Sequence, residues 1–151
     1  MSTLRFEHAL EIGVPPARLH AFLAALENFA PLHPLIESIT SLPPDPVRPA
    51  ARRYRVVDRI PVGPFRLKAT YRAAIEVITQ NEIRGEAWQS PGVHLVTTYH
   101  LEALGTGTRL RETVEVEAPF GLRRFVTHQA STSHRATLEG IKALLERETR
   151  S

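Results

Sequence analysis

The chain contains no cysteine, and other features that the sequence lacks each remove a further class of protein. Without cysteine there is no disulfide framework, no thiolate zinc site and no cysteine nucleophile. No apolar run approaches the ~20 residues that a helix needs to cross a bilayer. The N-terminus also lacks the basic segment and long apolar core of a secretory signal. We therefore expect no integral membrane segment and a cytoplasmic location.

Motifs that bind nucleotides or carry a catalytic serine are also missing. The chain has no nucleophile elbow, no Walker loop and no dinucleotide fingerprint. Gly105 and Gly107 lie on either side of a single threonine, which is typical of a hairpin turn. No helix follows them to hold a phosphate group, so we predict no nucleotide site.

The seven histidines do not have the spacing of a metal site. His94 and His100 lie on one predicted strand, roughly 20 Å apart at about 3.3 Å per residue. His128 and His134 point to different faces of a predicted helix, at about 100° per residue. No HExxH pair is present. We predict neither a metal ion nor any other cofactor.

The composition is ordinary for a globular protein, with 42% hydrophobic and 23% charged residues among 151. A chain of this length usually forms one core, so we predict a single domain over residues 1–151. The net charge of +3 raises the question of a nucleic-acid partner. Most basic residues alternate with apolar ones, as on the solvent face of a sheet. They are Arg52, Arg53, Arg55, Arg59, Arg66, Lys68 and Arg72. We expect no nucleic-acid partner, and a monomer or homodimer.

The N-terminal part of the chain predicts one strand followed by two short helices. Residues 4–14 alternate as a strand does, and His8 is the polar member of an otherwise apolar face. Pro15 and Pro16 suit the first turn of an amphipathic helix. Asn28 is expected to cap a second short helix, after which the strands resume.

A meander of antiparallel strands is predicted from residue 52 onward. A turn over residues 61–64 pairs Ile60 with Phe65. One face of the following strand is apolar throughout and is expected to point inward. It comprises Phe65, Leu67, Ala69, Tyr71, Ala73, Ile75 and Val77, and its alanines leave room for a ligand. The alternation over residues 82–89 is ambiguous, so the facing of Trp88 stays open.

The last predicted hairpin places an acid among inward-facing residues. Matching the apolar faces of residues 93–103 and 108–117 pairs Tyr99 with Glu112. A carboxylate on an apolar inward face must find hydrogen-bond donors or take up a proton. Glu112 is therefore a candidate for a special role.

The C-terminal helix changes character along its inward face. On a 3.6-residue period, the second half of that face holds Leu138, Ile141, Leu144 and Leu145, and the first half holds Val126, Thr127, Ala130, His134 and Thr137. A helix packed on a solid core would keep large side chains along its whole length, because interiors are close-packed. The small and polar half predicts a roof over a cavity that encloses an apolar small molecule.

Four segments are informative about the family: the entry to the first helix at residues 14–19, the stretch NFAPLHPLI at 28–36, the GTGT turn at 105–108, and the helix at 134–145. Together with the element order they resemble the START-type (SRPBCC, helix-grip) superfamily, near its bacterial polyketide cyclase/dehydrase and lipid-transport group. The resemblance covers essentially the whole chain. It implies an α+β helix-grip fold, in which a curved antiparallel sheet of about seven strands wraps around a long C-terminal helix. It also implies a deep cavity between the sheet and that helix.

The resemblance is specific for the fold and leaves the function open. The leading hypothesis is a protein that binds a hydrophobic small molecule, such as a lipid, a quinone or a polycyclic polyketide-like compound. The alternative is a polyketide cyclase or aromatase that acts on a poly-β-keto chain by general acid/base catalysis in the same cavity. A third possibility is a protein-interaction module that uses the basic sheet face.

The candidate catalytic residues are the inward-facing His134, Glu112 and Tyr99. Histidine is the usual proton-transfer group near neutral pH, but His134 is also explained as a core histidine with a hydrogen-bond partner. Glu112 has either a raised pKa suited to a general acid, or a buried partner such as Tyr99 or an arginine. A hairpin register shifted by one residue would instead turn it to water. Asp58 lies on the same side of its predicted strand as Tyr54, and it too is either a functional acid or a carboxylate with an ordinary structural role.

The candidate ligand-binding residues are the small and aromatic members of the inward faces. They are Tyr54, Ala69, Tyr71, Ala73, Trp88, Thr97, Val114, Val126, Thr127, Ala130, Thr137 and Leu138. Mostly apolar pockets with a few placed polar groups bind ligands through such side chains.

Overall fold

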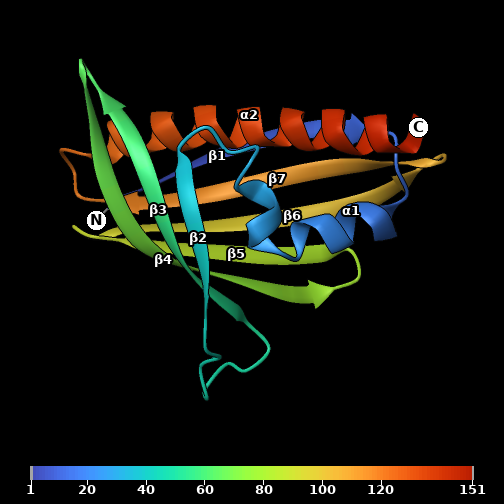
Figure 1. Ribbon diagram of the computed structural model, residues 1–151, viewed down its shortest axis with the longest axis horizontal. Coiled ribbons are helices and arrows are strands. Elements are labelled where there is room, and N and C mark those ends of the chain that lie inside the picture. The colour runs from blue at the N-terminus through green and yellow to red at the C-terminus, as the bar shows by residue number, and fades with distance from the viewer. Residues whose placement is uncertain (1, 151) are drawn as a thin grey trace.

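The structure is a computed structural model that describes residues 2–150. The strands are β1 (Ser2–Ile12), β2 (Ile36–Leu42), β3 (Arg52–Val62), β4 (Phe65–Thr79), β5 (Glu82–Gln89), β6 (Val93–Leu104) and β7 (Gly107–Ala118). The helices are α1 (Pro16–Leu23), the 3-10 helix η1 (Leu26–Phe29) and α2 (Arg123–Arg150). The strands form one antiparallel sheet in the order β1-β7-β6-β5-β4-β3-β2, which curves beside α2 (Figure 1). The predicted α+β helix-grip fold is confirmed.

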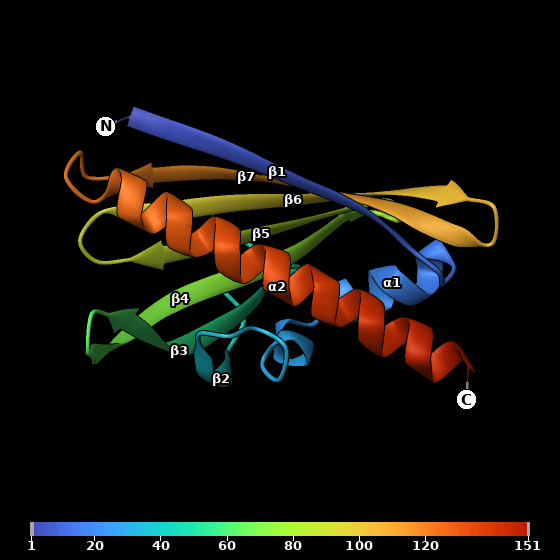
Figure 2. The ribbon, with the colours of Figure 1, turned by 90° about the horizontal axis from the view of Figure 1, so that it is seen from above.

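The helix α2 crosses one face of the sheet diagonally (Figure 2). The aliphatic residues of its C-terminal half, Leu138, Ile141 and Leu145, are buried in the main core together with Leu19 and Leu23 of α1. Burying a side chain of this kind contributes roughly 1.5–3 kcal/mol to stability. The C-terminal half therefore anchors the helix, and its first half is free to carry small and polar side chains.

The β6–β7 hairpin has the predicted register. Tyr99 lies opposite Glu112 and Thr97 lies opposite Val114. The two strands are long and alternate regularly, so only one pairing places both apolar faces on the same side near a short turn. Glu112 accordingly points inward and is buried.

The β3–β4 hairpin differs from its prediction by two residues. Ile60 lies opposite Leu67, and not opposite Phe65. The turn contains two residues instead of four, and it begins at Gly63 with a φ of 57°, which glycine adopts without steric cost. A shift of two residues leaves each side chain on its predicted face.

The long inward face predicted for β4 is only partly covered. Its middle, at Ala73 and Ile75, is buried, but Phe65 is 68% exposed and Leu67 is 54% exposed. The strand has 15 residues and so is about 50 Å long at about 3.3 Å per residue. The hairpin end therefore extends beyond α2, as Figure 1 shows at its upper left.

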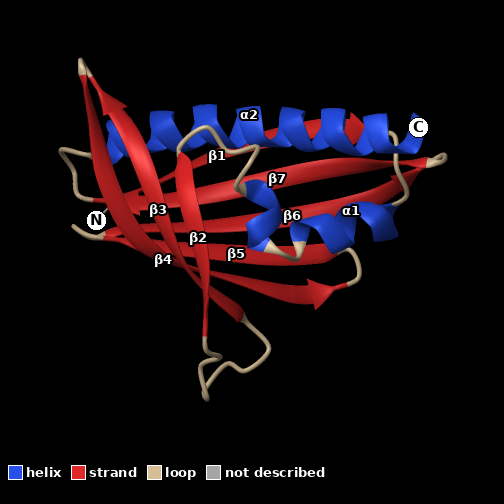
Figure 3. Cartoon of the chain, viewed as in Figure 1, coloured by secondary structure: helices blue, strands red, loops and turns tan. Residues whose placement is uncertain are grey.

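The segment between β1 and β2 needs two corrections. The strand β1 ends at Ile12 because the backbone N–H of Gly13 donates to Glu146 of α2 at 2.8 Å and not to another strand. Asn28 does not cap a helix but lies inside η1, which follows Ala25. Its side-chain amide donates instead to the carbonyl of Phe22 at the end of α1, at 3.1 Å. Figure 3 shows the two short helical segments below α2, and the β2–β3 loop extending away from them.

Candidate functional site

A cavity with two adjoining chambers lies between the sheet and α2. The core chamber has a volume of about 90 Å³, and the end chamber, near the start of α2, has a volume of about 230 Å³. Both are bordered by His33, Tyr71, Ala87, Leu95 and His134, so the two chambers meet at these residues. Most of the lining is apolar, and a few ionisable side chains interrupt it.

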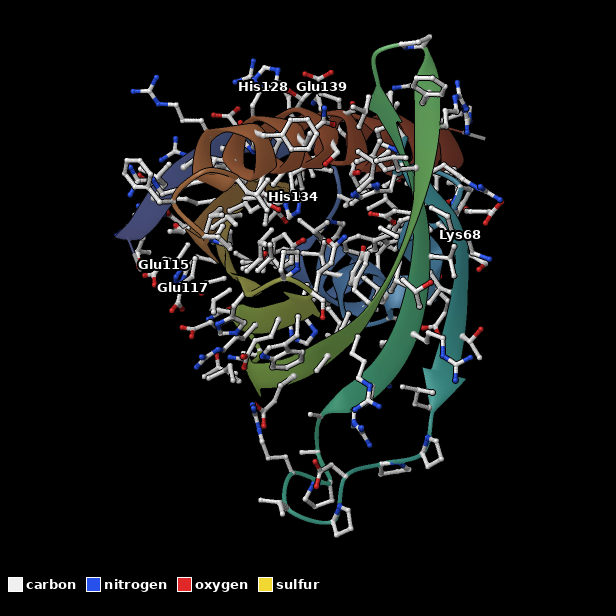
Figure 4. The ribbon with its side chains drawn as sticks, turned by 90° about the vertical axis from the view of Figure 1, so that its left-hand side faces the viewer. Lys68, Glu115, Glu117, His128, His134 and Glu139 are labelled. Carbon is white, nitrogen blue, oxygen red and sulfur yellow. The ribbon has the colours of Figure 1, made fainter. Side chains whose placement is uncertain are left out.

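The first half of α2 supplies the helical side of the cavity. Val126, Ala130 and Ser133 border the end chamber, Thr137 borders the core chamber, and His134 borders both. Figure 4 shows His134 on the inner side of this helix, with His128 and Glu139 on its outer side. The small side chains at these positions leave the space between the backbone of α2 and the sheet unfilled.

Glu112 on β7 is only 1% exposed and is held between two histidines. Its Oε2 lies 2.9 Å from Nδ1 of His134, and its Oε1 lies 3.1 Å from Nδ1 of His8 on β1. The second contact follows from the sheet, because β1 pairs with β7 so that His8 lies opposite Glu112. The N-terminal strand β1 and the C-terminal helix α2 thus both contribute a histidine to one carboxylate of β7.

The contact between Glu112 and His134 is an ion pair. Burial alone would raise the pKa of Glu112, but the charge of His134 and hydrogen bonds from His134 and His8 lower it to about 2. Burial would likewise lower the pKa of His134, but the charge of Glu112 raises it. A raised pKa for Glu112, one of the two possibilities that the sequence allows, is therefore wrong. His134 is the proton donor of the pair.

Tyr99 lies beside this pair on β6, opposite Glu112 in the hairpin. Burial, and then the charge of Glu112, raise the pKa of Tyr99 well above its usual range. The phenol therefore keeps its proton near neutral pH. Tyr99 also borders the core chamber, and so contributes a hydroxyl group next to the ion pair.

A second carboxylate, Asp58 on β3, borders the end chamber. The hydroxyl of Tyr71 on β4 donates a hydrogen bond to Oδ1 of Asp58 at 3.4 Å. Burial raises the pKa of Asp58 to about 6, against the smaller opposing effects of Tyr71 and the charge of His134. Burial and the charge of Asp58 raise the pKa of Tyr71 well above its usual range. Asp58 therefore titrates close to neutral pH, and Tyr71 does not.

His33, in the segment before β2, is neutral. Its ring centroid lies 6.2 Å from that of His134, with the rings edge to face. Burial, and then the charge of His134, lower the pKa of His33 to about 3. Its Nδ1 accepts a hydrogen bond from the backbone N–H of Leu35 at 3.2 Å, so the ring hydrogen is on Nε2. His33 thus offers a neutral donor at the junction of the two chambers.

Most of the predicted site residues border the cavity. The three candidate catalytic residues His134, Glu112 and Tyr99 all line the core chamber. Seven of the candidate ligand-binding residues line one or both chambers: Tyr71, Ala73, Thr97, Val126, Ala130, Thr137 and Leu138. The other five, Tyr54, Ala69, Trp88, Val114 and Thr127, are not part of the lining formed by residues 2–150.

Three of these five residues have a clear structural setting. Tyr54 is buried in the core and donates a hydrogen bond to Glu27 at 3.3 Å. Val114 on β7 is fully buried. Trp88, whose facing the sequence leaves open, is 40% exposed and stacks on His94 with ring centroids 5.5 Å apart. The inward positions of β5 are the odd-numbered ones, which places Trp88 on the opposite face from the cavity.

Two ionisable residues of the site, His8 and His33, are missing from the candidates that the sequence suggests, whereas Asp58 is among those that it suggests. A signal exists for His8, because it interrupts an apolar face at an inward strand position. His33 lies in an irregular segment, where no periodicity indicates the direction of a side chain. Its role depends on how that segment packs against α2.

The cavity therefore combines proton-carrying and proton-accepting groups with an apolar wall. His134 and His33 offer ring N–H donors, and Asp58 offers an acceptor.

No helix within residues 2–150 is long and apolar enough to cross a membrane. Among the same residues there is no cluster of three or more His, Asp or Glu side chains arranged to hold a metal ion.

Comparison with known proteins identifies a family and several structural neighbours. A family model described as polyketide cyclase / dehydrase and lipid transport matches residues 3–146. No curated protein sequence matches the chain significantly. The Zhui aromatase/cyclase from Streptomyces sp. R1128 has a TM-score of 0.82 at 15% identity, covering 99% of this chain and 98% of that one. A START superfamily protein from Mycobacterium smegmatis has a TM-score of 0.71 at 16% identity, and the match covers 93% of this chain and 98% of that one.

A third neighbour is larger than this chain. The di-domain ARO/CYC StfQ from the steffimycin biosynthetic pathway has a TM-score of 0.78 at 12% identity, over 99% of this chain. The chain spans 52% of the StfQ chain, about half its length. At these identities the similarity to all three structures is one of fold.

Proposed function

The chain belongs to the polyketide cyclase/dehydrase and lipid transport family, and we propose that it binds a largely apolar small molecule between the sheet and α2. The observation that carries the proposal is the end chamber of about 230 Å³, which continues into the core chamber. An apolar cavity of about 150 Å³ in another protein binds benzene. The end chamber has room for at least one aromatic ring or a comparable length of hydrocarbon chain.

The few polar groups of the cavity support binding in a defined orientation. His134 uses Nδ1 for Glu112, and its Nε2 has no hydrogen-bond partner among residues 2–150. In the protonated form, which the raised pKa of His134 favours, Nε2 also carries a hydrogen that can be donated to a carbonyl or hydroxyl oxygen of a ligand. Mostly apolar pockets commonly use a small number of such groups to orient what they bind.

The test is direct binding to the unmodified protein. We expect native mass spectrometry and calorimetry to detect a one-to-one complex with at least one of hexadecanol, a naphthoquinone and a hydroxylated anthraquinone. These probes represent the lipid, quinone and polycyclic classes. If none of them binds at concentrations up to their solubility, the proposal should be abandoned.

A second function, that of a polyketide cyclase or aromatase, is favoured by the ion pair on the cavity wall. General acid catalysis needs a proton donor held in position, and Glu112 holds His134 in this way at 2.9 Å, with Tyr99 nearby. The fold similarity to the Zhui aromatase/cyclase agrees with this candidate. Turnover of a poly-β-keto thioester, measured as formation of a cyclised product, separates an enzyme from a carrier.

The other sequence predictions about the setting of the protein stay predictions. They are a single domain over residues 1–151, a cytoplasmic location, a monomeric or homodimeric state, and no nucleic-acid partner. Size-exclusion chromatography with light scattering measures the oligomeric state directly.

A further inference from the structure

The ionisable side chains that border the cavity are mostly carboxylates, and the one cation among them, His134, is paired with Glu112. No lysine or arginine lines either chamber among residues 2–150, whereas Asp58, Glu86 and Glu112 do. Glu86 lies at an even-numbered position of β5, on the same side as Trp88, and its carboxylate forms ion pairs with Arg48 and His94. Glu112 is matched by His134. Asp58 is thus the carboxylate of the lining that has no cationic side chain bound to it.

Asp58 also has few hydrogen bonds for a buried carboxylate. It is 7% exposed, and the bond from Tyr71 at 3.4 Å is the one hydrogen bond that residues 2–150 donate to it. An ionised carboxylate has about four acceptor positions, and leaving them empty in a buried site is costly. Because Asp58 borders the end chamber, a bound ligand is in a position to fill them.

The other polar groups of the end chamber offset the negative charge of Asp58 only in small part. His33 is neutral, since its Nδ1 accepts the Leu35 N–H and burial holds its pKa near 3. The charge of His134 is already balanced by Glu112 at 2.9 Å. A ligand carboxylate in this chamber would therefore lie near Asp58 with no free cation to compensate it, and like charges placed together disfavour binding strongly.

We propose that the cavity selects ligands with a neutral hydrogen-bond donor, such as a phenolic or alcoholic hydroxyl group, which donates to Asp58, and that it rejects ligands with a carboxylate. This inference rests on the proposed binding function and narrows it. Free fatty acids are then poor ligands, while long-chain alcohols and hydroxylated aromatic compounds are good ones. His33, through Nε2–H, provides the complementary donor for an oxygen of the same ligand.

The experiment compares three probes of nearly equal size at pH 7.5 by calorimetry: 2-naphthol, 2-methoxynaphthalene and 2-naphthoate. The first donates a hydrogen bond, the second has the same oxygen without a donor, and the third is an anion. We expect 2-naphthol to bind most tightly and 2-naphthoate at least about tenfold more weakly than 2-naphthol. In Asp58→Asn, the discrimination against 2-naphthoate should decrease, because the negative charge is gone.

The control is Glu102→Gln, which removes one exposed negative charge on β6 and should leave the discrimination unchanged. Equal binding of 2-naphthol and 2-naphthoate to the unmodified protein would overturn the inference, and this result does not depend on whether Asp58→Asn folds. Discrimination that persists unchanged in a folded Asp58→Asn variant would overturn the role of Asp58. Failure of all three probes to bind would instead count against the proposed function.

Discussion

Nδ1 of His134 on α2 lies 2.9 Å from Oε2 of Glu112 on β7, and this ion pair joins the long helix to the sheet at the wall of the cavity. The same carboxylate reaches His8 on β1 through its other oxygen, at 3.1 Å. The contact holds one ring nitrogen of His134 against the sheet and leaves the other for a ligand. It also determines which of the two residues carries the proton.

Replacing Glu112 by glutamine should lower both the pKa of His134 and the stability of the protein. The attraction of Glu112, the main effect that raises the pKa of His134, is lost, and burial, which lowers it, is then opposed only by the weaker attraction of Asp58. We expect the free energy of unfolding at pH 7 to fall by about 2 kcal/mol, because the buried charge-assisted hydrogen bond between residue 112 and His134 is weakened. NMR titration of the His134 ring and urea unfolding measure the two effects.

Glu115→Gln is the matched control for this change. Glu115 lies on the same strand but points outward and is exposed, as Figure 4 shows. It should leave the titration of His134 unaltered. An unchanged pKa of His134 in Glu112→Gln would contradict the ion pair.

The neutral state of His33 should make the protein sensitive to mild acid. The folded-state pKa of His33 is about 3, below the ordinary value of 6.5, so the unfolded chain takes up a proton first as the pH falls. Stability is therefore lost from pH 6.5 downward. Between pH 6.5 and 5 the loss due to His33 is about 2 kcal/mol, at about 1.4 kcal/mol for each pH unit.

Asp58 acts in the opposite direction, so the test must isolate His33. The raised pKa of Asp58 means that its proton stabilises the folded state as the pH falls from about 6 toward 3.8. Urea unfolding of His33→Gln should show a smaller loss between pH 6.5 and 5 than the unmodified protein shows. His128→Gln, an exposed change on α2, should retain the full loss, and identical profiles for both variants would rule out a buried neutral His33.

Filling the end chamber should abolish binding without unfolding the protein. Ala130 borders this chamber from α2, and a tryptophan there occupies space that a ligand needs. We expect Ala130→Trp to lose measurable affinity for any probe that binds the unmodified protein, at a stability cost of about 1–3 kcal/mol for overpacking. Ala136→Trp, an exposed position on the same helix, should retain binding. Full affinity in Ala130→Trp would mean that the ligand lies elsewhere.

Substitution of His134 separates catalysis from binding. If the protein is a cyclase, His134→Gln should lower turnover by roughly 10² to 10⁴, the usual contribution of one general acid or base. Ligand affinity should change much less, because glutamine still offers a hydrogen-bond donor. Calorimetry and a product assay on the same preparation give both numbers, with His128→Gln as the control. A parallel loss of affinity, activity and melting temperature would identify His134 as a structural residue.

The facing of the residues in the last hairpin and the different character of the two halves of α2 can be read from the sequence alone. Strict alternation in residues 93–117 places Glu112 inward and pairs it with Tyr99, and the structure has the same pairing. The bulky aliphatic residues after Leu138 and the small ones before it indicate which half of α2 packs and which half borders a space. These features depend on local periodicity, which a sequence displays directly.

The alternation of apolar and polar residues along a strand predicts which face of the sheet a side chain lies on, but not which residue of the neighbouring strand lies opposite it. For this reason the pairing predicted for Ile60 is shifted by two residues while its face is correct. The length of the turn, which depends on the backbone conformation at Gly63, decided between the two registers.

Only the tertiary structure decided which polar residues meet. His8 and His134 are more than a hundred residues apart in the sequence, and they meet at Glu112 because β1 is the edge strand that pairs with β7 and because α2 packs against both strands. The direction of the pKa shift of Glu112 depends on that convergence, since burial without His134 would raise the pKa. Distances between elements arise from sheet curvature and helix packing, and these depend on all the side chains of the core together.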